Sequence, residues 1–201
     1  MRRMKEADAK ELFASVTDRI DMDSVPLDDD KTYELLSNGD TDGVYMMETN
    51  WDKYDLLHIK PKNFEELIAC VAFSHNSLLN PYIYTYLKMK EVHPFTYPIY
   101  TKIEYVESVL KDTYGLLVYQ HQAAQISDYI EGMNNEEKET YKLAIRIMKN
   151  EIERRKHTLA DYSFFKKRAL LCYRMAYIKS NMPEHFSLFM AERCEKGSIQ
   201  S

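Results

Sequence analysis

Three cations recur along one predicted helix in a pattern that suits phosphate binding. Lys142, Arg146 and Lys149 are three or four residues apart in TYKLAIRIMKNEIERRK, so a helix places them on one face. Arg154 and Arg155 extend the positive charge toward the end of the segment. Such a row neutralises phosphates of a nucleic acid without reading its sequence. The alternative is a solvated face whose acidic start and basic end complement the helix dipole.

A later segment interleaves basic and aromatic side chains. Lys166 and Lys167 follow Phe164 and Phe165, and such a mixture can stack unpaired bases beside cations that bind phosphate. The competing interpretation is burial, because several residues here are spaced to share one helical face. That face comprises Phe165, Ala169, Cys172 and Ala176.

The stretch TYGLLVYQHQ, residues 113–122, ends an apolar run with two amide side chains. Tyr119, Gln120 and Gln122 are candidates for contacting a ligand, since an amide offers both donors and an acceptor. The same side chains can instead bond local backbone at the start of a helix, because Tyr119, Ala123 and Ile126 fall at helical spacing. The residues alone leave both interpretations open.

No pattern in the sequence predicts a metal centre, a cofactor or a catalytic residue. The six histidines lack the close spacing of HExxH, and Cys70, Cys172 and Cys194 form no CxxC pair. An odd number of scattered cysteines is typical of reduced thiols in a cytosol. The start MRRMKEADAKELF is charged and no long apolar run follows it, so neither a signal peptide nor a membrane span is expected. We therefore predict a cytoplasmic protein.

Composition indicates one compact folded unit. The 201 residues are 45% hydrophobic with only 5 Gly and 6 Pro, so a sizeable core is expected and long linkers are not. The 27 basic and 32 acidic residues give a net charge of −5, which opposes approach to a polyanion. Nucleic-acid binding would therefore depend on a local basic patch.

Apolar periodicity predicts a mainly α fold with short extended or turn segments. Asp28 or Asp29 is expected to cap one helix, and Gly39 and Gly43 to bracket a tight reversal before a strand or buried turn. The prolines in residues 92–101 predict an extended loop. The predicted helices cover residues 5–20, 119–130, 135–157, 162–180 and 183–194, with another that begins after Asn63.

Four segments, in order, resemble the fingers region of the alpha subunit of bacterial DNA polymerase III, a replicative polymerase. The first two are VPLDDDKTYELLSNGDTDGVYMMET and IKPKNFEELIACVAF; TYGLLVYQHQ and YRMAYIKSNMPEHFSLFMAE follow. The resemblance implies a single fingers-like helical domain over residues 25–195. An N-terminal helical extension, residues 1–24, would precede it, and a polar tail, residues 196–201, would follow.

The resemblance also has implications for chemistry. It implies that Tyr119, Gln120 and Gln122 lie near the polymerase cleft. The metal-binding aspartates of such polymerases belong to the palm, for which this sequence has no counterpart, so no catalytic residue and no primer extension are expected. Within the fingers, His75 stands where the family has an arginine, which weakens the case for triphosphate binding.

Three functions remain open at this point. The first is a weak, sequence-independent nucleic-acid or replication-associated binding module, with single-stranded or primed DNA or a replication protein as its partner. The second is a protein-interaction or regulatory domain that kept the scaffold without DNA binding. The third is a fingers region supplied to a palm on another chain, which ranks last because the nucleotide-facing positions are altered.

Overall fold

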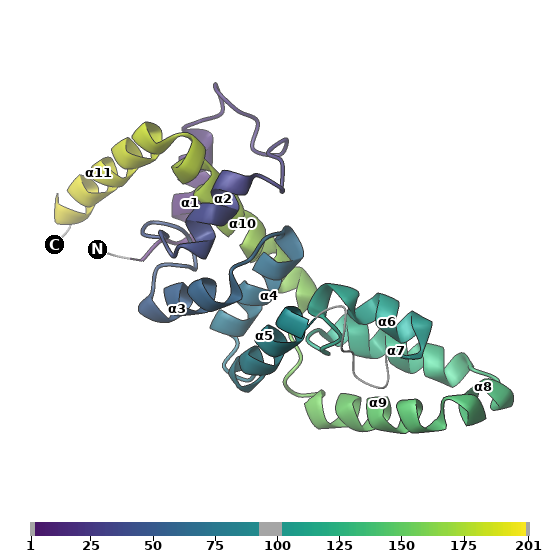
Figure 1. The fold of residues 1–201 in the computed structure, drawn as a ribbon. Coiled ribbons are helices and arrows are strands. Elements are labelled where there is room, and N and C mark those ends of the chain that lie inside the picture. The colour runs from purple at the N-terminus through teal and green to yellow at the C-terminus, as the bar shows by residue number, and fades with distance from the viewer. Residues whose placement is uncertain (1–2, 93–101, 200–201) are drawn as a thin grey trace. The chain divides into compact units, whose positions relative to one another are not determined.

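The computed structural model describes residues 3–92 and 102–199, so most of the loop predicted over residues 92–101 lies outside the described part. Within that part the chain is helical, and its one isolated bridge pairs Tyr119 with Ala160 (Figure 1). The prediction of a mainly α fold is therefore confirmed. No helix of the described residues is long and apolar enough to cross a membrane.

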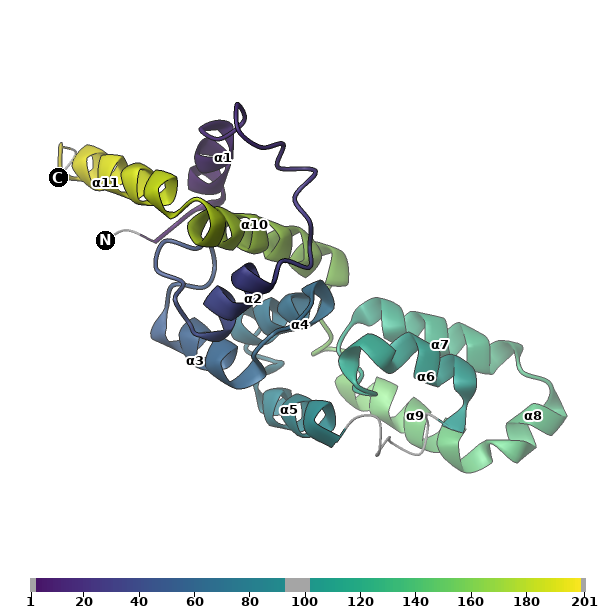
Figure 2. The ribbon, with the colours of Figure 1, turned by 45° about the horizontal axis from the view of Figure 1, so that its top comes forward.

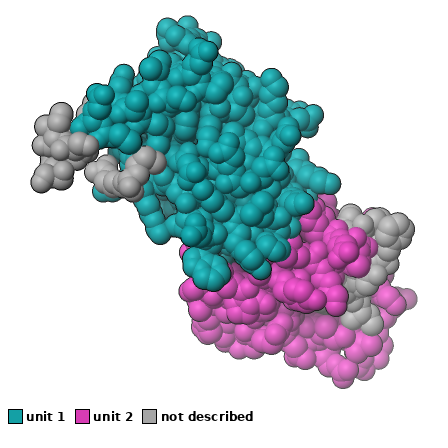
Figure 3. Space-filling view, turned by 60° about the vertical axis from the view of Figure 1, so that its left-hand side comes forward, with its two compact units in different colours: residues 1–74, 166–201 teal, residues 75–165 magenta. Residues whose placement is uncertain are grey.

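The chain divides into two compact units (Figure 3). Unit 1 comprises Met1–Ser74 and Lys166–Ser201, and unit 2 comprises His75–Phe165. Unit 1 contains α1 (Glu6–Ala14), α2 (Asp30–Ser37), α3 (Asn50–Ile59), α4 (Phe64–His75), most of α10 (Tyr162–Asn181) and α11 (Pro183–Ile199). Unit 2 contains η1 (Asn80–Tyr82), α5 (Ile83–Val92), α6 (Glu104–Leu110), η3 (Lys111–Thr113), α7 (Gln120–Gly132), α8 (Asn135–Thr140) and α9 (Lys142–Arg155).

Helix α4 forms the centre of unit 1 and is buried on all sides. Its residues from Glu66 to Phe73 are all buried, because the apolar run LIACVAF carries no polar face. Burial among these side chains raises the pKa of the Cys70 thiol, which therefore stays protonated. The helix begins as predicted, with the Asn63 side chain accepting a hydrogen bond from the Glu66 amide at 3.0 Å.

The helix cap and the chain reversal predicted near the start of unit 1 are both observed. The Asp29 carboxylate accepts hydrogen bonds from the amide and the hydroxyl of Thr32, which confirms the predicted cap of α2. Gly39 and Gly43 both have positive φ, as a tight reversal requires. The apolar run after Gly43 forms a buried turn, in which the Thr41 hydroxyl donates to the Met47 carbonyl.

Two predicted helices differ from the observed ones. The helix expected over residues 5–20 ends at Ala14, where the Ser15 hydroxyl donates to the Leu12 carbonyl and competes with helix continuation. The helix expected over residues 135–157 is broken at Tyr141 into α8 and α9. Tyr141 has φ −103° and ψ 17°, and its ring packs against the core of unit 2. Packing at this point therefore turns the chain between two short helices.

The core of unit 2 is formed where α7 packs against α6 and α9 (Figure 2). Each helix contributes residues at helical spacing, which produces one continuous apolar interior. Its members include Val106, Leu110, Ala123, Ile126, Ile130, Ile145 and Met148. Outside this core, α9 exposes Lys142, Arg146 and Lys149.

Candidate nucleic-acid interface

Helix α9 separates an apolar face from a basic one. Ala144, Ile145 and Met148 are buried against the rest of unit 2. Arg146 and Lys149 are exposed, since rotations of three and four residues keep them off the apolar stripe. The three cations predicted from the sequence, with Lys142 as the third, therefore reach solvent from one helix.

An open hollow of about 370 Å³ brings these cations together. Its lining combines apolar side chains from the core edge with basic ones from two helices. Lys138 of α8, which the sequence analysis does not single out, joins the predicted set. Its position four residues before Lys142 was the available signal. The lining residues are Ile130, Lys138, Lys142, Ile145, Arg146, Lys149 and Asn150.

The four cations differ in how they are held. Lys142 Nζ lies 2.9 Å from Glu139 Oε1 in a highly exposed ion pair, which contributes little stability. Lys138 Nζ donates to the Glu131 carbonyl at 2.9 Å. Among the described residues, no carboxylate lies within ion-pair distance of Arg146 or Lys149. The positive charge available to an external anion is therefore concentrated on these two.

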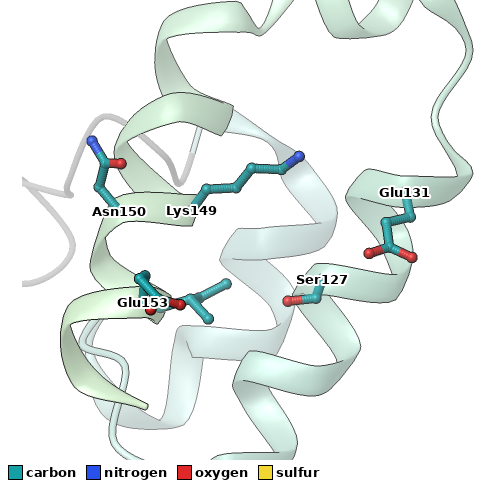
Figure 4. A pocket seen from close by; sticks show the side chains of 6 residues that line it. Ser127, Glu131, Lys149, Asn150 and Glu153 are labelled. Carbon is teal, nitrogen blue, oxygen red and sulfur yellow. The ribbon is translucent and has the colours of Figure 1, made fainter.

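A second hollow of about 410 Å³ adjoins the first at Lys149 and Asn150. Figure 4 shows Lys149 extending from α9 toward α7, which carries Ser127 and Glu131. Glu153 contributes another carboxylate to this lining. These acidic groups lower the local positive potential, so any anion that binds at Lys149 is expected to bind weakly.

The two arginines at the end of α9 have local partners. Arg154 forms an ion pair with Glu151, with 2.6 Å between Nη2 and Oε2. Arg155 is fully buried, and its guanidinium carbon lies 3.6 Å from the centroid of the Tyr82 ring. Arg155 follows Met148 and Ile152 at helical spacing. This spacing in the sequence indicates that Arg155 faces inward as they do. The structure thus places Arg155 away from the solvent-facing cations.

Lys166 and Lys167 belong to unit 1, where both are exposed on α10. The neighbouring helical face predicted to be buried is buried: Phe165 is 6% exposed, and Ala169, Cys172 and Ala176 are fully buried. Phe164, which is not part of this buried face, is 43% exposed. These two lysines thus belong to unit 1, whereas the hollow on α9 belongs to unit 2.

Gln122 has a local structural role. The side chain is 2% exposed, and its Oε1 accepts hydrogen bonds from the amides of Val118 and Tyr119, each at 3.0 Å. Its Nε2 donates to the Thr113 hydroxyl at 3.0 Å and to the Val109 carbonyl at 3.3 Å. The amide thus ties the Thr-Tyr-Gly turn to the start of α7. Its hydrogen-bonding capacity is filled by unit 2 itself.

Tyr119 and Gln120 stand at the start of α7 and differ in exposure. Gln120 is exposed, and its Nε2 donates to the Leu159 carbonyl at 3.2 Å. Tyr119 is buried, with its ring stacked on His121 and edge-on to Tyr162, at centroid distances of 5.7 and 5.1 Å. Of the predicted cleft motif, Gln120 is the member whose side chain reaches solvent.

The described residues contain no group of three or more histidine, cysteine, aspartate or glutamate side chains that could hold a metal ion. The lining of the hollow on α8 and α9 combines four cations with the apolar side chains of Ile130 and Ile145. Its chemistry is that of anion binding by lysine and arginine, with room for an apolar group beside the charges.

These features define a domain whose described residues are helical, form two compact units and carry a basic hollow on α8 and α9. A sequence model of the bacterial DNA polymerase III alpha subunit finger domain matches residues 5–163. The chain belongs to this family, which confirms the resemblance seen in its four segments.

Several curated relatives are DNA polymerase III alpha subunits. The subunit of Thermus aquaticus is 29% identical over 214 residues, which cover 90% of this chain and 17% of the relative. The subunit of Aquifex aeolicus is 31% identical over 193 residues, covering 81% of this chain and 16% of the relative. That of Staphylococcus aureus is 26% identical and covers 83% and 18%. The chain therefore spans about a sixth of the length of these relatives.

Proposed function

We propose that this fingers domain is a replication-associated module that binds nucleic acid weakly and without sequence preference. Single-stranded or primed DNA is the proposed ligand, and the hollow on α8 and α9 is the proposed phosphate site. The observation that carries the proposal is the convergence of Lys138, Lys142, Arg146 and Lys149 on one open hollow. Arg146 and Lys149 lack a carboxylate partner among the described residues, so they can neutralise phosphate without breaking an ion pair.

The charges around the hollow set the expected strength of binding. Three or four phosphate contacts give a log-log slope of affinity against salt of about 2 to 4. The net charge of −5 and the carboxylates of Glu131 and Glu153 oppose the approach of DNA. We therefore expect micromolar affinity at low salt that falls steeply toward physiological ionic strength.

A triple substitution tests the proposal. Replacing Lys142, Arg146 and Lys149 with Gln should abolish binding of labelled single-stranded and primed DNA, measured by fluorescence anisotropy across a salt series. Helix content by circular dichroism should not change, because all three side chains are exposed.

The matched control removes the same charge from unit 1. Its substituted residues are Lys10, Arg19 and Lys31, which are also exposed and also comprise one arginine and two lysines. The control should bind DNA as the parent does, apart from a small general effect of net charge. Equal binding by the parent and the α9 variant would show that the basic face is only solvated, and would contradict the proposal.

A protein-interaction domain is the second candidate. The observation that favours it is the mixed character of the α9 surface, where Leu143 is 47% exposed beside the cations and carboxylates line the adjoining hollow. Protein interfaces combine exposed apolar residues with a polar rim in this way. If neither variant loses DNA binding, or if the parent protein does not bind DNA, the result favours a protein-interaction domain.

A further inference from the structure

Helix α3 of unit 1 carries a row of exposed rings. Trp51 is 78% exposed and Tyr54 is 53% exposed, and His58, one turn further, is also exposed. The Trp51 and Tyr54 rings meet edge to face with centroids 6.4 Å apart, and the Tyr54 and His58 rings lie 4.0 Å apart. The spacing of three and four residues aligns all three rings along one side of the helix.

The row is not needed to hold α3 in place. The opposite side of the helix is anchored by Leu56 and Ile59, which are buried. The start of the helix is fixed by a capping box, in which the Thr49 hydroxyl accepts from the Asp52 amide and the Asp52 carboxylate accepts from the Thr49 amide. Packing and capping therefore account for the fold of α3 without the exposed rings.

The charges around the row favour a negatively charged partner. Asp52 is 3% exposed, and the Asp55 carboxylate accepts a hydrogen bond from the Ser74 hydroxyl at 2.7 Å, so both acids of α3 have roles inside unit 1. Lys60 and Lys62 follow the end of the helix and are exposed. In a protein of net charge −5, α3 and the residues just after it thus offer exposed rings and cations, while neither carboxylate of α3 is among the exposed residues.

We propose that α3 is a stacking platform for unpaired bases, with Trp51 and Tyr54 in contact with bases and Lys60 and Lys62 near the phosphates. Single-stranded nucleic acid matches both features, because every base has a flat face and each nucleotide carries a negative charge. A projecting ring can fill a pocket of a protein partner as well as stack on a base, so the exposed lysines after α3 are the feature that favours a polyanion. The inference rests on nucleic acid as the ligand of the proposed function but uses a different surface.

Trp51 is the only tryptophan of the chain, so its fluorescence reports on this surface directly. A short oligothymidylate should quench Trp51 when it binds the intact protein. An abasic oligonucleotide of the same length carries the phosphates without bases and should leave Trp51 fluorescence unchanged. The hollow on α9, in contrast, should bind both oligonucleotides, since it contacts phosphate alone.

Substitutions give a second measurement. Trp51→Ala and Tyr54→Ala should each weaken oligothymidylate binding by about fivefold to about a hundredfold, the range expected for the loss of one stacked base. Neither should change binding of the abasic oligonucleotide. Tyr84→Ala is the matched control, because Tyr84 is an equally projecting ring, 70% exposed, on α5 of unit 2, and it should have no effect.

The outcomes separate this inference from the proposed function. Oligothymidylate binding without quenching, and without an effect of Trp51→Ala, overturns the stacking platform and leaves the α9 site standing. Quenching that persists in the α9 triple variant supports the platform, whereas binding of the abasic oligonucleotide that persists in this variant contradicts the α9 site. If the parent binds neither oligonucleotide, both proposals fail and the rings of α3 are a surface for another class of partner.

Discussion

Gln122 connects three parts of unit 2 through one side chain. Its amide bonds the amides that open α7, the hydroxyl of Thr113 in the preceding turn, and the carbonyl of Val109 in α6. Such a buried polar group stabilises a fold only when all its partners are present, because each unpaired donor or acceptor left behind is costly. The amides that end TYGLLVYQHQ thus hold the apolar run in place.

The first prediction compares the two glutamines of this motif. Gln122→Ala should lower the free energy of unfolding by about 2 to 3 kcal/mol, since it leaves buried backbone groups without partners. Gln120→Ala should cost less than about 1 kcal/mol, because its side chain is exposed and donates one hydrogen bond. Urea unfolding followed by circular dichroism measures both values. Similar losses for the two variants would contradict the role assigned to Gln122.

At the scale of elements, turns and helix ends depend on backbone geometry that few residues adopt. Gly39 has φ +68° and Gly43 has φ +78°, in the left-handed region where an added Cβ is strained. At Gly43 that Cβ would also lie 2.7 Å from Met190 Cε of α11. Gly132, at the end of α7, has no atom within 4 Å of the position of a Cβ. Replacement by alanine is therefore opposed by backbone strain at Gly39, by strain and a steric clash at Gly43, and by neither at Gly132.

The second prediction is an alanine series at these glycines. Gly39→Ala should cost about 1 to 2 kcal/mol of stability from backbone strain alone. Gly43→Ala should cost more, because the Met190 side chain must also move. Gly132→Ala should raise stability by about 0.5 to 1 kcal/mol, since alanine loses less backbone freedom in a helix. Urea midpoints of the three variants give the order, and a loss of stability at Gly132 would contradict it.

At the scale of the whole molecule, the chain forms two compact units that carry different spectroscopic probes. Trp51, the sole tryptophan, belongs to unit 1, whereas helices of both units contribute to circular dichroism. A unit with its own core can unfold as its own cooperative step. The contact between the Trp51 and Tyr54 rings is lost when α3 unfolds, so the fluorescence of Trp51 follows unit 1.

The third prediction concerns urea unfolding of the Gln122→Ala variant. The transition followed by Trp51 fluorescence should not coincide with the transition followed by circular dichroism. The substitution weakens unit 2, so the dichroism transition should gain an early phase while the Trp51 midpoint stays close to that of the parent. Gly43→Ala serves as the opposite case, because it weakens unit 1 and should lower the urea midpoint followed by Trp51 fluorescence. Equal shifts of both probes in both variants would show that the units unfold as one.

The sequence by itself determined the features that depend on neighbours within one helical turn. The caps at Asp29 and Asn63, the reversal at Gly39 and Gly43, and the buried face of α10 were predicted because their hydrogen bonds or periodicity are local. The alignment of Lys142, Arg146 and Lys149 follows from helical spacing for the same reason. Family membership was also visible in four short segments.

Only the tertiary structure decided which candidate side chains are buried and which lie together. Gln122 finds partners 9 and 13 residues earlier in the chain, and Arg155 stacks on Tyr82 of a distant 3-10 turn. The break at Tyr141 and the entry of Lys138 into the hollow likewise depend on packing against other helices. Burial is a sum over contacts between segments far apart in the chain, so local spacing indicates the apolar face of a helix but not the partners that a buried polar side chain finds.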